Sequence, residues 1–250
     1  MKTMVVANQK GGVGKTSTLV HIAFDFLERG LRVAVIDLDT QGNASYTLKQ
    51  FSTNVISSSF LLNESISFDS LTSDKGLFLF PADSQLANME NKSIQLVSST
   101  FRNNIQKLKH CDFDVVLIDT APSLGVTMAA ALFAADFVLS PIELESYSLQ
   151  GIKKMMTTIS QVRKANRGLV FLGMLPSKVD ARNPRHKRHL SELEQSYPEL
   201  LIPASIGLRS SVADALASGI PVWKIRKTAA RIAGKEMKQT ANYLFEKMGV

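Results

Sequence analysis

The stretch that decides the fold is the heptapeptide Lys10-Gly11-Gly12-Val13-Gly14-Lys15-Thr16. It joins a short apolar run, residues 3–8, to a stretch with helical periodicity, residues 16–29. Glycines at such a junction let backbone N–H groups approach phosphate oxygens without clashes from a Cβ. The helix that follows presents its N-terminal amides and the positive end of its dipole to an anion. The heptapeptide therefore predicts a phosphate-binding loop between a strand and a helix.

The side chains of this loop have predicted tasks. Lys15 is expected to reach the β- and γ-phosphates of a nucleotide, and the hydroxyl of Thr16 to bind Mg²⁺. ATP and Mg²⁺ are thus the expected ligands. The predicted nucleotide-binding residues here are Lys10, Gly11, Gly12, Val13, Gly14, Lys15, Thr16 and Ser17. Gln9 stands where such loops usually have their first glycine, and the extra Lys10 sits too early to repeat the role of Lys15.

Strand and helix signals alternate along the rest of the chain. Strands are expected at residues 3–8, 32–37, 77–80, 115–118, 137–140 and 169–175, and helices at 16–29, 97–110, 126–134, 148–165 and 228–248. Short elements are expected near 200–203 and 212–217, and a Ser-rich stretch, 50–74, reads as irregular or as short helices. The alternation predicts an α/β fold, a P-loop NTPase fold whose mainly parallel twisted sheet has helices on both faces. We expect a single domain, residues 1–250, with no helix-turn-helix module ahead of the loop.

Three carboxylates accompany the strands. Asp37 and Asp39 end the second strand, and residues two apart point to the same side of an extended segment. Both are therefore expected at the crevice outside the carboxyl ends of the strands. Asp119 follows the apolar run 115–118, and a carboxylate there can hold Mg²⁺ through water.

Several stretches resemble the ParA/MinD family of ATPases over nearly the whole chain. Residues 8–16 are similar to its deviant Walker A motif, 37–44 to its second motif, and 116–125 to its Walker B and switch region. Glu145, residues 149–151 and the closing segment 202–222 also fit, and the whole looks closest to the short IncC-type partition ATPases of plasmids. Thr40 departs from the pattern, since the family usually has proline there, and this loosens the loop around Asp39.

The resemblance implies roles that the residues alone do not fix. It implies that Lys10 acts across an ATP-dependent homodimer, so that the predicted catalytic set is Lys10, Lys15, Asp39 and, as a second candidate, Asp37. Asp39 would orient the attacking water. Hydrolysis is expected to be slow alone and stimulated by DNA and by a ParB- or KorB-like centromere-binding protein. The adenine is expected at loops 176–180 and 202–205, with Pro203 as the contact.

Composition sets further bounds. The chain has 250 residues, one cysteine, Cys111, and no apolar run long enough for a membrane span, which favours a cytoplasmic protein. The net charge of +7 is uneven: residues 1–150 carry −4 and residues 151–250 carry +11. A half this basic suggests a polyanionic partner.

The basic half supplies the predicted DNA contacts. No aromatic residues are interleaved for base stacking, so contacts would be to phosphates, independent of sequence and sensitive to salt, as in ParA-like proteins that coat the nucleoid. The candidates are Lys178, Arg182, Arg185, Lys187, Arg188, Arg209, Lys224, Arg226, Lys227, Arg231, Lys235 and Lys238.

Two other classes remain open. A MinD-like ATPase on a membrane surface would need a basic amphipathic C-terminus, but in residues 241–250 Glu246 and Lys247 balance. A metabolic P-loop enzyme or an iron–sulfur reductase is less favoured, because no second substrate motif appears and there is a single cysteine. A ParA-like protein could also position a protein cargo rather than a replicon.

Overall fold

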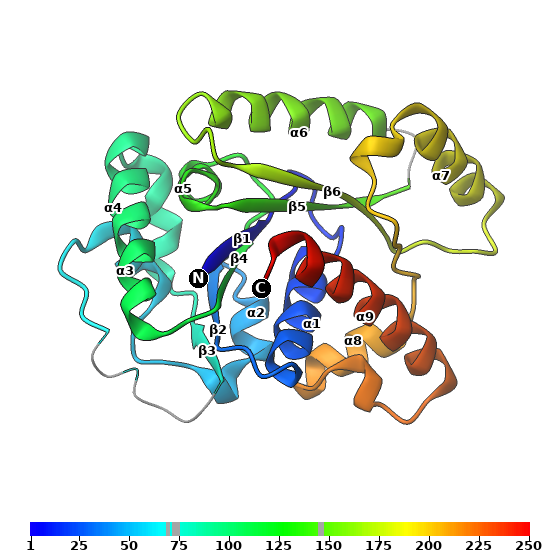
Figure 1. The fold of residues 1–250 in the computed structure, drawn as a ribbon, viewed down its shortest axis with the longest axis horizontal. Helices are drawn as coiled ribbons and strands as arrows, with labels where there is room; N and C mark the ends of the chain where they lie inside the picture. Colours follow the sequence, from blue (N-terminus) through cyan, green and yellow to red (C-terminus); the bar gives the residue numbers. More distant parts are fainter. Residues whose placement is uncertain (69–70, 72–75, 145–147) are drawn as a thin grey trace.

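The computed structural model describes residues 1–68, 71, 76–144 and 148–250. In these residues six strands form one sheet in the order β3-β2-β4-β1-β5-β6 (Figure 1). The strands are β1 Lys2–Val6, β2 Val33–Leu38, β3 Leu77–Phe80, β4 Val115–Thr120, β5 Phe137–Glu143 and β6 Val170–Ser177. All neighbouring pairs are parallel. Their nearly continuous apolar composition follows from this, because a parallel sheet is covered on both faces.

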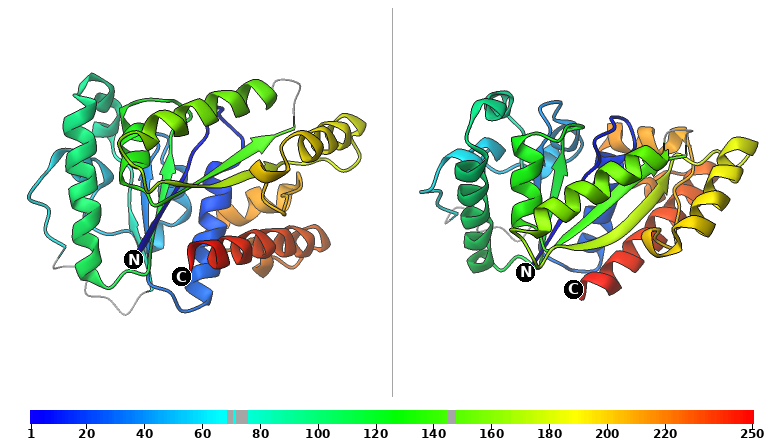
Figure 2. Two further views of the ribbon diagram at one scale, coloured as in Figure 1. Left: turned by 45° about the horizontal axis from the view of Figure 1, so that its top comes forward. Right: turned by 90° about the horizontal axis from the view of Figure 1, so that it is seen from above.

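Helices cover both faces of the sheet (Figures 1 and 2). One face carries α3 Ser57–Leu62, α4 Ile94–Lys107, α5 Val126–Ala134 and α6 Ser148–Arg163. The other carries α1 Lys15–Glu28, α2 Asn43–Thr47, α8 Ser210–Ser218 and α9 Thr228–Met248, while α7 Pro184–Ser196 lies beyond the end of β6. Short 3-10 turns at Lys49–Phe51, Ser84–Asn91, Leu108–Cys111, Pro198–Leu200 and Val222–Lys224 complete the chain. The two termini lie close together in all three views (Figures 1 and 2).

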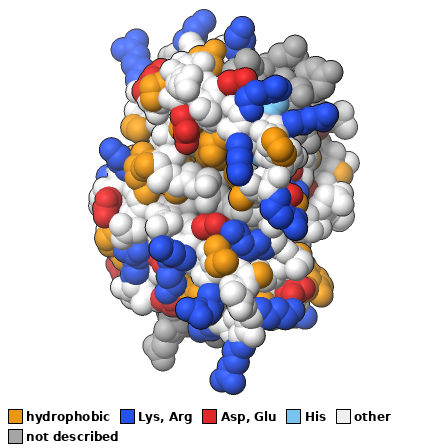
Figure 3. All heavy atoms as spheres, turned by 90° about the vertical axis from the view of Figure 1, so that its right-hand side faces the viewer, with side chains coloured by type: hydrophobic (Ala, Val, Ile, Leu, Met, Phe, Trp, Pro, Cys, Tyr) orange, Lys and Arg blue, Asp and Glu red, His pale blue; other side chains and the backbone are white. Residues whose placement is uncertain are grey.

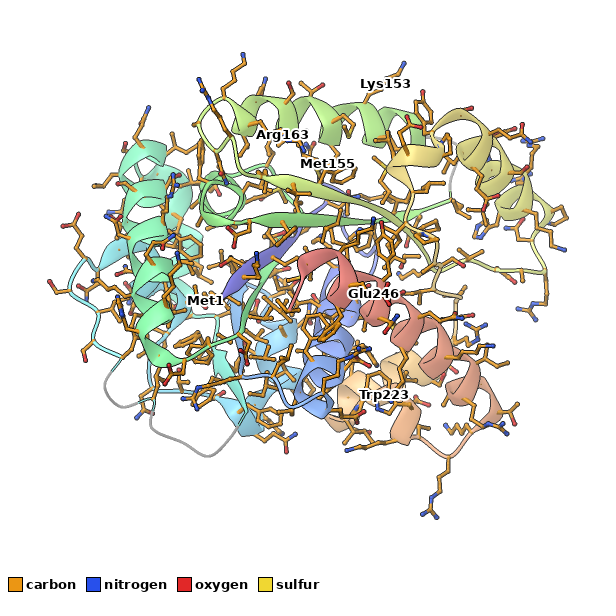
Figure 4. All side chains as sticks on the ribbon, viewed as in Figure 1. Met1, Lys153, Met155, Arg163, Trp223 and Glu246 are labelled. Atoms are coloured by element: carbon orange, nitrogen blue, oxygen red, sulfur yellow. The ribbon has the colours of Figure 1, made fainter. Side chains whose placement is uncertain are left out.

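Each face of the sheet has its own hydrophobic core. Successive strand residues point to opposite faces, so Val5 joins the cluster under α4 and α5, and Met4 joins the cluster under α1 and α9. The helices are amphipathic, with their apolar sides against the sheet and their polar sides toward solvent. In α6, Met155 points toward the sheet and is buried, whereas Lys153 points away (Figure 4).

The predicted fold class is confirmed, and most predicted elements are present with shifted ends. The helices expected at 126–134 and 228–248 occur with those bounds as α5 and α9. The strand expected at 137–140 continues to Glu143, because pairing with β6 carries it past the apolar run. Within the polar stretch 50–74, α3 is the short helix that the structure describes, and residues 69, 70 and 72–74 lie outside the described part.

The main element that the sequence reasoning missed is α7. Its high charge hides the helical period, although Leu190 and Leu193 turn toward the sheet edge. A local signal was present: the Asn183 side chain accepts from the amide of Arg185, and Pro184 occupies the first turn. Asparagine before proline is a favoured helix start, and this pair could have located the helix.

Candidate functional site

The predicted phosphate loop lies at the point in the sheet where the order of the strands reverses. The chain reaches β4 and β2 on one side of β1 and β5 and β6 on the other, so β1 is the switch point of the topology. Open α/β sheets bind their ligands outside the carboxyl ends of the strands at such a point. The loop after β1 therefore stands at the expected place for a ligand.

The backbone of the loop has the conformation that its glycines allow. Gly12 and Gly14 have positive φ angles of 76° and 92°, and a Cβ on Gly14 would lie 2.7 Å from the Ser177 hydroxyl oxygen. Gly14 is also the N-cap of α1, which begins at Lys15. The start of the loop is fixed to the sheet, since the Asn8 side chain amide donates to the carbonyl of Pro141 at 2.8 Å. The loop is thus anchored and has its following helix in place for an anion.

Lys15 is buried under the loop. Its Nζ donates to the carbonyl oxygen of Lys10 at 3.3 Å, so the side chain folds back beneath the glycines. Burial lowers the pKa of Lys15, and the nearby carboxylates of Asp119 and Asp39 oppose that shift. This places the ammonium group of Lys15 at the floor of the loop; its contact with the β- and γ-phosphates stays a prediction.

Thr16 and Asp119 form a pair at the end of α1 that meets the sheet. The Thr16 hydroxyl donates to Asp119 Oδ2 at 2.6 Å. Asp119 is fully buried, and its other oxygen, Oδ1, has no hydrogen-bond partner among the described residues. Burial, followed by the charge of Asp37, raises the pKa of Asp119 to about 8.

These two residues fit a Mg²⁺ ion. A hydroxyl and a carboxylate oxygen are hard ligands of the kind that Mg²⁺ prefers, and the ion usually keeps several waters. The unpartnered Oδ1 of Asp119 is a buried acceptor for such a water, and a divalent cation would relieve the unfavourable burial of its charge. Thr16 and Asp119 are therefore the residues that would hold the metal.

Asp37 and Asp39 have different surroundings, although the sequence predicted one side for both. Strand β2 ends at Leu38, so the alternation no longer holds at Asp39. Asp39 lines the pocket beside the loop, whereas Asp37 is fully buried and does not line it. Asp37 accepts from the amide of Asp39 at 3.1 Å and from the amide and hydroxyl of Ser45 at 2.8 and 2.7 Å. Asp37 anchors the turn that carries Asp39.

Lys10 and Lys178 both contact the carboxylate of Glu143, on the side of the loop away from Asp37 and Asp119. Lys10 Nζ lies 2.9 Å from Glu143 Oε2, and Lys178 Nζ lies 3.2 Å from Glu143 Oε1. Burial alone would raise the pKa of Glu143, but hydrogen bonds from the two lysines outweigh it and hold the pKa below its ordinary value. Lys178, predicted as a DNA contact, thus lies at the phosphate loop.

The pocket beside the loop has a volume of about 520 Å³. It is lined by Gly11, Gly12, Gly14, Lys15, Thr16, Ser17, Asp39, Gln41, Asn43, Tyr46, Thr47, Pro122, Lys178, Leu216 and Ala217. Pro203, predicted at the adenine, does not line it and instead borders two other hollows near α9. Glu145, the other residue that the resemblance pointed to, lies outside the described part of the chain.

Most of the predicted DNA contacts gather on α7, on α9 and on the turn that precedes α9. Figure 3 shows Lys and Arg side chains spread over this face of the molecule. Several are in ion pairs: Arg182 with Asp180, Arg188 with Glu192, Lys227 with Asp214, and both Lys224 and Lys238 with Glu28. Among the described residues no carboxylate lies within ion-pair distance of Arg185, Lys187, Arg226, Arg231 or Lys235, which are all exposed.

Arg209 differs from the rest of the basic set. It precedes α8, is only partly exposed, and both its terminal nitrogens contact the carboxylate of Glu236 on α9. A two-pronged arginine–carboxylate pair holds its geometry strongly. Arg209 therefore fastens α8 to α9 and has less charge to offer to a ligand.

Sequence reasoning missed Glu143 and the position of Lys178 at the loop. Both follow from strand pairing, because Glu143 is in register with Ser177 at the carboxyl ends of β5 and β6. The available signal was that each residue stands at the end of an apolar strand. This signal is not specific, since charged residues are common at strand ends.

No helix in the described part of the chain is both long and apolar enough to cross a membrane.

Comparison with known proteins supports one family. Residues 1–171 match the family AAA_31, described as an AAA domain. Protein IncC of Escherichia coli is 61% identical over 257 residues, with 100% of this chain and 71% of that protein covered. The chromosome partitioning protein ParA of Caulobacter vibrioides is 30% identical, with 89% of this chain and 86% of that protein covered.

One solved structure with a similar fold contains a bound nucleotide analog and magnesium. Cobyrinic acid a,c-diamide synthase from Mycobacterium smegmatis, with bound ATP analog and magnesium, is 30% identical and superimposes with a TM-score of 0.76. The alignment covers 100% of this chain and 97% of that one. A homologous structure thus binds an adenine nucleotide with magnesium, the ligands that the loop geometry accommodates here. On the family match, the relatives and the P-loop site together, the chain belongs to the ParA/MinD family of P-loop ATPases.

Proposed function

We propose that this protein is a partition ATPase switched by its nucleotide. In this proposal MgATP joins two copies of the chain, the dimer holds duplex DNA without sequence preference, and hydrolysis releases it. The 61% identity to Protein IncC over the full chain supports the partition role. The observation that carries the switch is the position of Lys10, whose side chain is 48% exposed at the rim of the loop while Lys15 occupies the floor.

The chemistry proposed for the site is hydrolysis of the terminal phosphate. Lys15 neutralises the transferring phosphoryl group, and Asp39 at the pocket wall orients the attacking water. Mg²⁺, when bound, supplies further neutralisation of the phosphate charge. Asp37 acts through Asp39, because it holds the turn on which Asp39 lies.

The exposed rim position of Lys10 supports a role across the dimer. A second copy that faces the loop would bring its own Lys10 toward the nucleotide, and the terminal phosphate then becomes a contact between the two chains. Loss of that phosphate weakens the contact, so turnover acts as a timer. Slow turnover alone and acceleration by DNA and a centromere-binding partner of the ParB or KorB kind are part of the proposal.

The basic surface on α7, α9 and the turn before α9 supports the DNA part of the proposal. Its exposed lysines and arginines carry no base-reading pattern, so binding would depend on phosphate charge and on salt. In a dimer two such surfaces act together and the contact area doubles, which makes retention on DNA depend on ATP. A cytoplasmic protein that is associated with the nucleoid is the expected location.

The test measures association and DNA retention with different nucleotides. Sedimentation of the full chain with MgATP, ATP analog and MgADP is followed by binding to random duplex DNA and to anionic liposomes. Dimers and DNA retention with MgATP, and neither with MgADP, support the proposal. Retention on liposomes but not on DNA would instead identify a membrane-surface ATPase. A dimer that binds neither would direct the search to a protein cargo.

A further inference from the structure

Three neighbouring strands place one charged residue each beside the phosphate loop. Lys10 lies in the loop after β1, Glu143 ends β5, and Lys178 directly follows β6. These strands are adjacent in the order β1-β5-β6, so their carboxyl ends lie side by side. The group is separate from the acidic residues Asp37 and Asp119, which belong to β2 and β4 on the other side of β1.

The group consists of two lysines on one carboxylate, with each oxygen of Glu143 facing one ammonium at 2.9 and 3.2 Å. The Glu143 side chain is 17% exposed, whereas those of Lys10 and Lys178 are 48% and 44% exposed. The carboxylate is therefore shielded and the two cations face outward. Two positive charges against one negative charge leave a net positive charge at the rim of the loop.

Lys178 lies over the loop itself. A Cβ built on Gly12 would lie 3.8 Å from Lys178 Nζ, and Lys178 lines the pocket together with Gly11 and Gly12. Its backbone has a positive φ of 54°, which in the described residues Asp112 alone shares among non-glycines. A residue with a Cβ seldom adopts this left-handed conformation, because its Cβ comes too close to the following carbonyl oxygen. The fold holds the lysine there against its own backbone preference, as happens at ligand sites.

We propose that Lys178 is a second phosphate-binding lysine of this site, and that Glu143 holds Lys178 until the terminal phosphate of a bound nucleotide replaces Glu143 as its counter-charge. The proposal rests on the nucleotide site described above and adds residues that set the preference for triphosphate over diphosphate. A terminal phosphate carries more negative charge than one carboxylate and lies at the loop that Lys178 covers. A diphosphate leaves Lys178 on Glu143.

Lys178→Met tests the phosphate contact, because methionine keeps the length of the side chain and removes the charge. We expect roughly tenfold weaker binding of a fluorescent ATP analogue, with Mg²⁺, and less than about threefold weaker binding of the ADP analogue. Lys178→Arg should restore the ratio of the two affinities. Titrations at protein concentrations low enough to keep the chain monomeric measure both.

Glu143→Gln tests the competing role of the carboxylate. The substitution removes the counter-charge of both lysines, and we expect roughly fivefold tighter binding of the ATP analogue with little change for ADP. The gain should shrink when Lys178→Met is also present, because the two residues are coupled. Glu192→Gln is the matched control, since Glu192 bridges Arg188 and His189 on the exposed α7, and it should leave both affinities unchanged.

The outcomes separate this proposal from the partition function. Equal losses for ATP and ADP in Lys178→Met, or unchanged or weaker ATP binding in a Glu143→Gln variant that melts at the temperature of the wild type, would overturn it. These readouts need neither a dimer nor DNA. If instead the variants behave as expected but the wild type does not dimerise with MgATP, the partition proposal fails and the role of Lys178 stands.

Discussion

Asp37 and Asp119 are register partners on the neighbouring strands β2 and β4, and both are fully buried. Two like charges so placed disfavour ionisation of each other, and burial raises the pKa of both carboxyls. Hydrogen bonds from Ser45 and from the Asp39 amide offset part of the shift at Asp37. Asp119 has the Thr16 hydroxyl on one oxygen and no partner among the described residues on the other. Asp119, which would hold Mg²⁺ through water, is therefore the uncompensated member of the pair.

Asp119→Asn is expected to stabilise the chain in the absence of nucleotide and metal. The folded pKa of about 8 lies above the ordinary value of 3.8, so between these pH values the unfolded chain releases a proton that the folded chain keeps. Stability from this group is complete below about pH 4 and is lost as the pH rises toward 8. Urea unfolding with a chelator should show a gain of roughly 1–3 kcal/mol for the variant at pH 8 and a smaller gain at pH 5. Glu199→Gln, the control at an exposed carboxylate, should leave the unfolding free energy unchanged at both pH values. An Asp119→Asn variant that is less stable than the wild type at pH 8 would contradict the raised pKa of Asp119.

Asp37→Asn and Asp39→Asn should separate anchoring from catalysis. Asp39→Asn leaves the buried hydrogen bonds of Asp37 in place, so we expect normal stability and nucleotide affinity with ATP turnover reduced by at least about a hundredfold. In Asp37→Asn an amide group takes the place of an oxygen that accepts from Ser45 or Asp39, and we expect a loss of about 1–3 kcal/mol of unfolding free energy. Urea unfolding and single-turnover hydrolysis measure the two effects. Full stability in Asp37→Asn together with lost turnover would move the catalytic role to Asp37.

The sequence was sufficient for the parts of the site that are local in the chain. The strand–loop–helix unit around Lys15 and Thr16 could be predicted because glycines, lysine and hydroxyl stand in fixed order over a few residues. Asp119 could be placed because an apolar strand leads directly to it. The association of Lys178 with Glu143 could not be predicted, because it depends on the register of β5 and β6. The sequence alone places Lys178 among the other basic residues of the C-terminal half. The different roles of Asp37 and Asp39 also required the observed end of β2 at Leu38.

Basic residues without an acidic partner should contribute more to DNA binding than those already in ion pairs. Arg231 and Lys235 are exposed on α9 with no acidic partner among the described residues, so each is available to a DNA phosphate. We expect Arg231→Ala and Lys235→Ala each to reduce the slope of log affinity against log salt by roughly 1 with random duplex DNA. Lys227→Ala should have a smaller effect, because Lys227 already neutralises Asp214 at 2.9 Å. Fluorescence anisotropy from about 50 to about 300 mM salt measures the slopes.

Lys153→Ala is the control for this series, since Lys153 is exposed on α6, on the opposite face of the sheet. Its salt slope should equal that of the unsubstituted chain. Equal slopes for all four variants would show that α9 does not contact DNA, whereas an effect of Lys153 alone would move the surface to α6.

Lys10→Ala and Lys15→Ala should fail at different steps. Lys15 lies at the buried floor of the loop, so its loss removes the charge under the phosphates, and we expect nucleotide affinity to fall by at least about a hundredfold. Lys10 lies at the rim, 48% exposed, and contacts Glu143 in its own chain. We expect Lys10→Ala to keep nucleotide affinity within about threefold of the wild type, because little of its charge reaches a nucleotide in the same chain. Its ATP-dependent dimer should be lost. Calorimetry for binding and sedimentation for association measure the two steps, and equal loss of binding in both variants would argue against a role for Lys10 across the dimer.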